Sequence, residues 1–406
     1  MNAYWIVNAT IETGFNHDSR VTETCTETAH LKIEDETIIE LMSAYPAQTN
    51  LPVIDAKGAL LLPAFREMHI HIDKTYYSGP WKAVEPAVNG IFTRIEEEQT
   101  ILKEQLPVAE ERAKKMIELL LQNGHTHIRT HCNIDPVTGI ENLKATVRAL
   151  KAYEAYLTYE IVAFPQHGLL RSNAESLVRQ AMEHGVTHVG GVDPATVDRN
   201  INQSLETMFA IARDYEKDID IHLHDPDSLG AFEMEQIADL VKKNRYEGRV
   251  TVSHALALGD LNEKRLQQLT RILSDAKIDV TTTVPINRPT IPIPSLWEAG
   301  IPVSVGHDSI TDHWSPFGTG NTIDKLATLG ERFGISDEVG LNQLLKYATG
   351  GITTLSAEGQ QQWPKPGDTA SFMFIDATCS AEAIARRKSI QLVFGKGKQF
   401  LMERSL

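Results

Sequence analysis

Cysteines and long apolar runs are scarce in this sequence. The three cysteines, Cys25, Cys132 and Cys379, lie far apart and form no CxxC pair. Their spacing argues against a disulfide framework and against a cysteine zinc site, and it suits a reducing compartment. No stretch approaches the roughly 20 apolar residues that cross a bilayer, and residues 1–8 lack a basic region followed by a long apolar core. We therefore expect no signal peptide, no membrane contact and a cytoplasmic protein.

Positive charge is also in short supply. Lysine and arginine number 39 against 54 aspartates and glutamates, which gives a formal net charge of −15. Nucleic acids and anionic membranes are bound through basic patches, so we expect neither as a partner. The remaining composition, with 42% hydrophobic and 23% charged residues, is typical of a globular enzyme with one large domain or two.

Apolar segments of β type alternate with helical segments through the middle of the chain. Helical patterns rich in Glu, Lys, Leu and Ala cover, for example, 109–122, 141–156 and 233–244. Eight β–α repeats of this kind predict an α/β fold, a parallel (β/α)8 TIM barrel. The expected strands are 68–72, 126–131, 159–166, 187–192, 219–224, 249–254, 278–283 and 301–306.

Both ends of the chain contain short strand-like segments. We expect residues 1–62 and 356–406 to form one small β-sandwich domain, and residues 63–355 to form the barrel. The connection 74–106 is unusually long and carries several aromatic residues. Its length predicts a lid or a binding loop, with a surface decoration as the alternative.

Two histidines one residue apart, His69 and His71, lie on the first expected barrel strand. Alternate residues of a strand point to the same face, so an extended His-x-His aims two imidazoles at one point. Imidazole is the commonest metal ligand among side chains. The pair alone is weak evidence, because two histidines can meet by chance on a polar strand.

Further histidines follow at the ends of other expected strands. Asp220, His222 and His224 would face the barrel interior, while His254 and Asp308 end or follow two later strands. Active sites of such barrels lie at the carboxyl ends of the strands. With the first pair, four strand ends supply five histidines and one aspartate, which chance placement does not explain. The sequence therefore predicts a metal site there.

The pattern of histidines and aspartate at the strand ends resembles that of the amidohydrolase superfamily, and longer motifs make this resemblance more specific. Segments 161–168 and 306–321 resemble bacterial cytosine deaminases, and segments 71–75, 190–196 and 222–225 resemble N-isopropylammelide isopropylaminohydrolases. Together with the His and Asp pattern, they identify the chain as similar to the cytosine deaminase-like branch of the amidohydrolase superfamily. The resemblance covers almost the whole chain. It implies a barrel with a small β-sandwich and one catalytic metal.

Carried over by position, the resemblance makes His69, His71, His222 and Asp308 the metal ligands. Three histidines and one carboxylate suit Zn²⁺ or Fe²⁺, with Mn²⁺ as a further alternative. Relatives with two metals bridge them with a modified lysine after the fourth strand, and segment 190–194 contains none. We expect one divalent metal per chain with an open position for water.

The same resemblance suggests the catalytic roles. A bound metal lowers the pKa of water toward neutrality, and Asp308 is placed to take the proton of that water. His254 would hydrogen-bond the hydroxide or the developing tetrahedral centre. For the proton shuttle, His224 shares a strand face with His222, whereas Asp225 occupies the position of the cytosine deaminase glutamate. We favour His224, with Asp225 orienting it or a neighbour.

Substrate contacts are expected from three further residues. Gln166 ends a strand and offers an amide donor and acceptor side by side, which suits the N–C=O edge of a ring. Lys74 would protonate a leaving amine or bind a ring carbonyl. Trp314, and equally Phe317, would stack on a flat ring or pack within the loop.

These expectations favour an aminohydrolase that removes an amino group from a ring carbon of a cytosine-like or related nitrogen heterocycle. The alternatives are an amine hydrolase for N-alkylamino-triazines and a hydrolase that opens a cyclic amide ring. The missing bridging lysine counts against the last of these. The expected partners are a small heterocyclic substrate and further copies of the same chain in a homo-oligomer.

Overall fold

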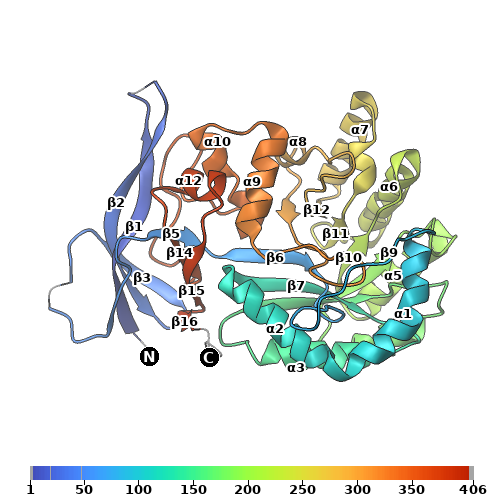
Figure 1. The fold of residues 1–406 in the computed structure, drawn as a ribbon. Helices are drawn as coiled ribbons and strands as arrows, with labels where there is room; N and C mark the ends of the chain where they lie inside the picture. The colour runs from blue at the N-terminus through green and yellow to red at the C-terminus, as the bar shows by residue number, and fades with distance from the viewer. Residues whose placement is uncertain (1–2, 19, 47, 402–406) are drawn as a thin grey trace.

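Two sheets organise the molecule (Figure 1). The structure is a computed structural model, and it describes residues 3–18, 20–46 and 48–401. One sheet is a barrel of eight parallel strands from the middle of the chain. The other is a mixed sheet of eight strands from both ends of the chain. The prediction of a TIM-like barrel with a small sheet domain built from both termini is therefore confirmed.

The barrel strands follow one another in chain order, each parallel to the next. The apolar side chains of these strands pack in one continuous core with those of the surrounding helices. Ile219, Ile221 and Leu223 belong to this core and are fully buried. The strands are β6 (Phe65–Ile70), β7 (His125–Asn133), β8 (Thr158–Phe164), β9 (His188–Val192), β10 (Asp218–His222), β11 (Val250–Ser253), β12 (Ile278–Thr282) and β13 (Val303–Val305).

The barrel closes where the segment after β13 meets the end of β6. The backbone N–H of Asp308 donates to the carbonyl of His69 at 2.6 Å, and that of His71 donates to the carbonyl of Asp308 at 3.0 Å. Gly306 makes this approach sterically feasible, because a Cβ there would lie 2.8 Å from Cβ of His69. The closure places the first and last barrel strands, and their polar side chains, side by side.

Helices cover the outside of the barrel. Several of them begin at a residue that caps the first turn or end at a residue that favours helix termination. Asn262 and Asn321 each accept a backbone N–H in the first turn of the helix that follows, and Gly334 ends α9 in the left-handed region with φ 66°. The helices are α1 (Ile91–Gln105), α2 (Ala109–Gln122), α3 (Glu141–Lys151), α4 (Glu175–Ala181), α5 (Ile201–Asp214), α6 (Asp227–Asn244), α7 (Glu263–Asp275), α8 (Ile293–Glu298), α9 (Thr322–Phe333), α10 (Glu338–Gln343), α11 (Lys346–Thr349) and α12 (Ser380–Ala385).

The mixed sheet has its own apolar core, which includes Ile6, Leu31, Phe372 and Phe394. Its central contact pairs β5 with β14 in antiparallel fashion, which joins the two ends of the chain. The strands are β1 (Ala3–Asn16), β2 (Glu23–Glu34), β3 (Thr37–Met42), β4 (Val53–Asp55), β5 (Leu60–Pro63), β14 (Phe372–Ile375), β15 (Ile390–Gly395) and β16 (Lys398–Phe400). Among the described residues, no helix is long and apolar enough to span a bilayer.

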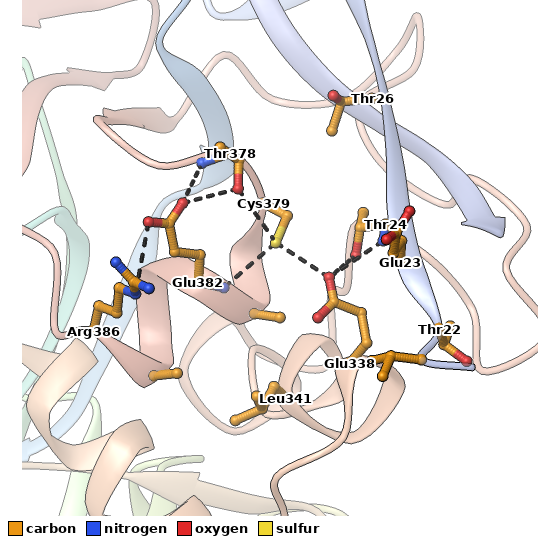
Figure 2. A pocket seen from close by; sticks show the side chains of 13 residues that line it. Thr22, Glu23, Thr24, Thr26, Glu338, Leu341, Thr378, Cys379, Glu382 and Arg386 are labelled. Carbon is orange, nitrogen blue, oxygen red and sulfur yellow. Dashed lines mark hydrogen bonds and ion pairs between the residues drawn. The ribbon is translucent and has the colours of Figure 1, made fainter. Parts of the chain in front are cut away.

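A buried carboxylate, Glu12 of β1, fastens the mixed sheet to the barrel side. It accepts hydrogen bonds from Nδ2 of Asn342 at 2.9 Å and from the backbone N–H of Ser380 at 2.5 Å. A surface hollow of about 630 Å³ lies nearby (Figure 2). None of its lining residues comes from a barrel strand, and Glu338 there is already paired with Thr24 and Cys379. The hollow is therefore separate from the strand ends where catalysis is expected.

Candidate active site

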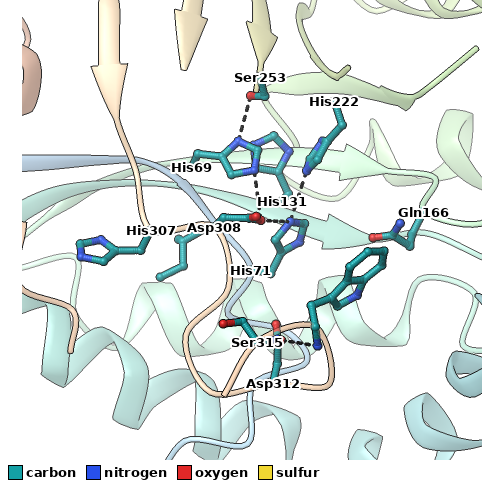
Figure 3. Close-up of polar contacts among 12 residues, drawn as sticks. His69, His71, His131, Gln166, His222, Ser253, His307, Asp308, Asp312 and Ser315 are labelled. Atoms are coloured by element: carbon teal, nitrogen blue, oxygen red, sulfur yellow. Dashed lines mark hydrogen bonds and ion pairs between the residues drawn. The ribbon is translucent and has the colours of Figure 1, made fainter. Parts of the chain in front are cut away.

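Four expected metal ligands meet at the carboxyl ends of the barrel strands (Figure 3). His69 is the second-last residue of β6 with His71 just beyond the strand, His222 ends β10, and Asp308 follows β13. One ligand atom from each residue lies within 4.8 Å of the others. Nε2 of His71 is 3.3 Å from Nε2 of His222 and 3.3 Å from Oδ1 of Asp308. The structure thus brings together residues from three separate strand ends.

The chemistry of these side chains fits a divalent cation. Nε2 of His69 is buried without a hydrogen-bond partner in the part of the chain that the structure describes. It lies 3.5 Å from Oδ1 of Asp308, where Nε2 of His71 and Nε2 of His222 also meet. Buried polar atoms without partners are costly, and three imidazoles with one carboxylate form a shell typical of zinc and related ions. The crowding of ligand atoms around one point therefore indicates a metal-binding site.

The protonation states also suit metal binding. Burial, with the nearby charge of Lys74, lowers the pKa of His71 to about 4, and burial lowers the pKa of His222 well below its ordinary value. Burial alone would raise the pKa of Asp308, but the neighbouring imidazoles of His69 and His71 hold it well below the usual range. At neutral pH His71 and His222 are therefore neutral and Asp308 is a carboxylate, as metal ligands require.

A hydrogen-bond chain beneath the site fixes the tautomer of His69. The hydroxyl of Ser253 donates to Oδ1 of Asp220 at 2.6 Å, and it lies 2.8 Å from Nδ1 of His69. Because its one proton is given to Asp220, Ser253 accepts from Nδ1–H of His69, which leaves the lone pair on Nε2. Asp220 is fully buried and also paired with Arg129 at 3.0 Å. Asp220 thus acts through Ser253, inside the barrel as the sequence predicts.

Two other clusters of metal-binding residue types occur among the described residues, and the carboxylate of each is already engaged by neighbouring side chains. In the first, Glu67 accepts from the backbone N–H groups of His69 and His307, both at 3.0 Å, and lies 2.5 Å from Nδ1 of His307. The second combines His69 and His131 with Asp220, whose oxygens serve Ser253 and Arg129. In both clusters the carboxylate is already engaged, although both ring nitrogens of His131 and Nε2 of His307 have no hydrogen-bond partner among the described residues.

His224 and His254 lie together beside the ligands, with ring centroids 4.2 Å apart. Nδ1 of His224 is 2.9 Å from Oδ2 of Asp193, and its backbone N–H donates to Oδ1 of the same carboxylate at 2.5 Å. Burial lowers the pKa of His224, but Asp193 outweighs it and raises the pKa above its ordinary value. Burial, with the charge of His224, lowers the pKa of His254 well below its ordinary value. The two imidazoles therefore differ in basicity.

Asp193 was not among the residues singled out from the sequence. It directly follows β9, so its place at a strand end was the available signal. Asp193, His254 and Asp308 all have positive φ, at 35°, 69° and 63°. Such backbone angles are uncommon for residues other than glycine and concentrate at functional sites. Three strand ends of the site share this feature.

Asp225 directly follows His224 and makes a different set of contacts. Its carboxylate accepts from the hydroxyl and the backbone N–H of Thr196, and its own backbone N–H donates to Asp193 at 3.2 Å. It also contacts the buried Glu233, where burial and the charge of Asp225 raise the pKa of Glu233 to about 9. Asp225 is thus engaged with Thr196 and Glu233, while Asp193 is the carboxylate that contacts His224.

Three expected substrate residues, Lys74, Gln166 and Trp314, lie together beside the metal ligands, and we call this group the wall of the site. Nζ of Lys74 is 3.1 Å from Oε1 of Gln166 and lies 5.6 Å from the ring centroid of Trp314. Lys74 and Gln166 are buried. Phe317 is 79% exposed and does not join this wall. The structure therefore brings Lys74, Gln166 and Trp314 together and leaves Phe317 outside.

Glu98 of α1 anchors this wall and was missed from the sequence. Its carboxylate is fully buried and accepts from Nζ of Lys74 at 3.1 Å, Nε2 of His167 at 2.8 Å and Nε2 of His313 at 2.9 Å. Glu98 is the last of three consecutive glutamates, a pattern typical of a solvated helix face. The long connection after β6 thus supplies a buried part of the site through α1.

The comparisons with known proteins agree with this geometry. The sequence profile of the amidohydrolase family matches residues 52–398. The uncharacterized protein YahJ of Escherichia coli K12 is 42% identical over 97% of this chain and 87% of its own length. The N-isopropylammelide isopropyl amidohydrolase of Pseudomonas sp. strain ADP is 31% identical over 73% of this chain and 74% of its own length.

Solved structures show the same fold. The N-isopropylammelide isopropylaminohydrolase of Burkholderia multivorans superposes with a TM-score of 0.86 at 27% identity, covering 98% of both chains. The 5-methylcytosine deaminase of Klebsiella pneumoniae gives a TM-score of 0.79 at 24% identity, covering 99% of both chains, and shows the fold alone. With the family profile matching most of its length and the His–Asp site in place, the chain belongs to the amidohydrolase family and is a metal-dependent hydrolase of carbon–nitrogen bonds.

Proposed function

We propose that the enzyme hydrolyses the bond between a ring carbon and an exocyclic nitrogen of a cytosine-like or triazine-like heterocycle. The observation that carries this proposal is the imidazole of His224, held by Asp193, beside the four ligand atoms of the metal site. A cation site next to an oriented imidazole provides both an electrophile and a proton carrier for a leaving nitrogen. The relatives named for N-isopropylammelide support a ring substrate.

The site holds one Zn²⁺ or Fe²⁺ ion in this proposal, with Mn²⁺ as the alternative, on His69, His71, His222 and Asp308. When bound, such an ion supplies Lewis acidity that makes water a nucleophile near neutral pH. One ion is proposed because β9 is followed by Asp193, which is bonded to His224, where enzymes with two metals place a bridging lysine. Asp193 at this position also argues against the alternative in which the enzyme opens a cyclic amide ring.

The chain's own groups account for the proton movements. Asp308 takes a proton from the attacking water, whose oxygen forms a bond to the ring carbon. His254, whose Nε2 has no partner in the described residues, hydrogen-bonds the atoms that gain charge at that carbon. His224 delivers a proton to the exocyclic nitrogen, the C–N bond breaks, and ammonia or an amine leaves. The remaining hydroxyl proton passes to the ring nitrogen beside that carbon as the ring carbonyl forms, and the proton held by Asp308 restores the one that His224 gave up.

Deamination is the first form of this reaction that we propose, and removal of an alkylamine is the second. The second form is favoured by the 31% identity to the Pseudomonas N-isopropylammelide hydrolase. Both forms use the same attack and the same proton delivery, and they differ in the size of the leaving group. The substituent on the departing nitrogen therefore decides between them.

The test is a release assay with purified, metal-loaded protein. Aminopyrimidines, aminotriazines, pterins and N-alkylamino-triazines are supplied, and ammonia and alkylamines are quantified separately. We expect release from at least one ring and a metal content near one per chain by elemental analysis. Hydrolysis confined to cyclic amides, with two metals per chain, would overturn the proposal.

A further inference from the structure

One arginine at the carboxyl ends of the barrel strands, Arg288, is exposed, and its guanidinium has no hydrogen bond or ion pair among the described residues. We propose that Arg288 binds a carboxylate of the substrate, carried either by the departing nitrogen or by the ring atom next to the reacting carbon. Arg288 is then a residue that determines specificity for anionic heterocycles. The inference rests on the proposed function and narrows its substrate class.

Residues 283–292, which connect β12 to α8, leave the barrel between two parts of the active site. On one side, the backbone N–H of His254 donates to the carbonyl of Thr281 at 2.7 Å. On the other side, the backbone N–H of Gly306 donates to the carbonyl of Thr282 at 2.9 Å. The connection therefore starts between β11, which leads to His254, and β13, which leads to the metal ligand that follows the next residue pair.

The backbone around Arg288 is held in place. The guanidinium of Arg332 on α9 donates to the carbonyl of Arg288 at 3.1 Å. Pro289 packs so closely on Gly259 that a Cβ at Gly259 would lie 3.0 Å from the carbonyl oxygen of Pro289. Val284 is buried and has a φ of 55°, a conformation that β-branched residues rarely adopt and that concentrates at ligand sites. The backbone of Arg288 is thus constrained, while its side chain is left free.

The charge of Arg288 reaches the imidazole that serves the departing nitrogen. Burial lowers the pKa of His224, Asp193 and Asp308 raise it, and the positive charge of Arg288 also lowers it. The guanidinium therefore lies on the side of the site where His224 meets the C–N bond. A fixed positive charge there is close to the substituent of the departing nitrogen and to the neighbouring ring position.

Lys74, in contrast, is fully used inside the protein. Its Nζ atom lies 3.1 Å from Oε1 of Glu98, 3.2 Å from Oδ1 of Asn133 and 3.1 Å from Oε1 of Gln166. These contacts account for all the N–H groups of an ammonium, and the side chain is only 1% exposed. Lys74 therefore holds other side chains in place and has no donor left for a leaving amine or an anion, whereas Arg288 keeps its whole guanidinium.

A guanidinium suits a carboxylate better than a neutral group of the same shape. It donates two parallel N–H groups to the two oxygens of a carboxylate, and such charge-assisted bonds are among the strongest in proteins. A carboxamide offers only one oxygen and no charge. Because the chain carries a formal net charge of −15, an anionic substrate gains from a cation at the site itself. We expect a preference of about tenfold for the acid.

Matched acids and amides test this preference. Cytosine-5-carboxylate is compared with cytosine-5-carboxamide, and N-carboxymethyl-ammelide with N-carbamoylmethyl-ammelide, on metal-loaded protein at about 0.15 M salt, which screens long-range steering. Release of ammonia or of the amine gives kcat/KM, and calorimetry gives binding. We expect the acid to be favoured by about tenfold in at least one pair. The pair that shows the preference identifies the position that carries the anion.

The outcomes separate this inference from the proposed function. Equal use of acid and amide in both pairs would overturn the inference and leave the proposed function standing. So would failure to bind either acid by an enzyme that releases ammonia or amines from other rings. Neither binding nor release with any ring would overturn both.

Arg288→Gln tests the residue itself. Glutamine keeps a polar side chain on the exposed connection and removes the charge, so the acid-to-amide ratio should fall by about tenfold. Arg171→Gln is the matched control, because Arg171 is exposed on the connection after β8, with Cζ 4.7 Å from the ring centroid of Phe92. Its ratio should stay within about twofold of the native value. An unchanged ratio in Arg288→Gln, or an equal fall in Arg171→Gln, would overturn the assignment to Arg288. If Arg288→Gln does not fold, the comparison on the native enzyme still decides the preference.

Discussion

Nδ1 of His224 lies 2.9 Å from Oδ2 of Asp193, so the imidazole beside the metal site is held by a carboxylate from the neighbouring strand end. β9 and β10 pair in parallel, which brings the residues that follow them to the same edge of the barrel. The carboxylate accepts from Nδ1–H and leaves Nε2 available for proton exchange. The pair resembles the His–Asp arrangement that orients a catalytic base in many hydrolases.

Asp193→Asn should therefore lower kcat strongly. An amide NH₂ in place of Oδ2 would face Nδ1 and favour the wrong tautomer of His224, a change that costs about 10²–10⁴-fold in comparable pairs. Metal content should remain near one per chain, because Asp193 is not a ligand. Elemental analysis beside steady-state kinetics separates the two effects.

Asp225→Asn is the control for that change. Asp225 is bonded to Thr196 and contacts Glu233, so its amide should leave His224 oriented and reduce kcat far less. If Asp225→Asn were the more damaging change with metal retained, Asp225 would be the group that serves the leaving nitrogen, and the role proposed for His224 would be wrong.

Much of this site could be predicted from strand periodicity. The contact between Asp193 and His224 and the burial of Glu98 could not. The alternation in His69–His71 and in His222–His224 placed these imidazoles at strand ends, because side-chain direction along a strand is a local property. Which carboxylate contacts His224 depends on the pairing of β9 with β10, and adjacency in sequence pointed to Asp225. Contacts across the barrel are not encoded in local patterns.

The fold shows the same division between local and distant information. The β–α alternation predicted the barrel, since each repeat has its own hydrophobic pattern. The burial of Glu98 could not be predicted, because a helix in a long connection can pack in many ways. Its donors come from His167 and His313, 69 and 215 residues away in sequence. A charged residue becomes recognisable as buried only once those partners are placed.

Ser253→Ala should weaken metal binding. The substitution removes the acceptor of Nδ1–H of His69, so the ring can rotate or change tautomer. Loss of such an outer hydrogen bond typically costs about 10–100-fold in metal affinity. Competition with a chelator of known affinity measures the change. Thr251→Val on the same strand removes a hydroxyl that contacts Arg129, and affinity lost equally there would contradict the role of Ser253.

Glu233→Gln should change how stability depends on pH. The pKa of Glu233 is raised to about 9 in the folded protein, above its unfolded value of about 4.3. The folded state therefore binds more protons between these values, and stability falls as pH rises through that window, by up to about 1.4 kcal/mol per pH unit from this group. Glutamine mimics the neutral form and should remove that part of the decline. Urea unfolding at pH 6, 7.5 and 9 checks the prediction, and parallel curves for the two proteins would contradict it.

Glu98→Ala should destabilise the protein and raise KM. It leaves the ammonium of Lys74 buried without its carboxylate, a loss of about 3–5 kcal/mol in comparable pairs, and it removes the acceptor that holds His167 and His313. Glu97→Ala is the matched control, because Glu97 pairs with Arg94 at 2.7 Å but its side chain is 21% exposed. A partly exposed pair contributes about 0–1 kcal/mol. Equal losses in urea unfolding for the two variants would show that Glu98 does not anchor the wall beside the metal ligands.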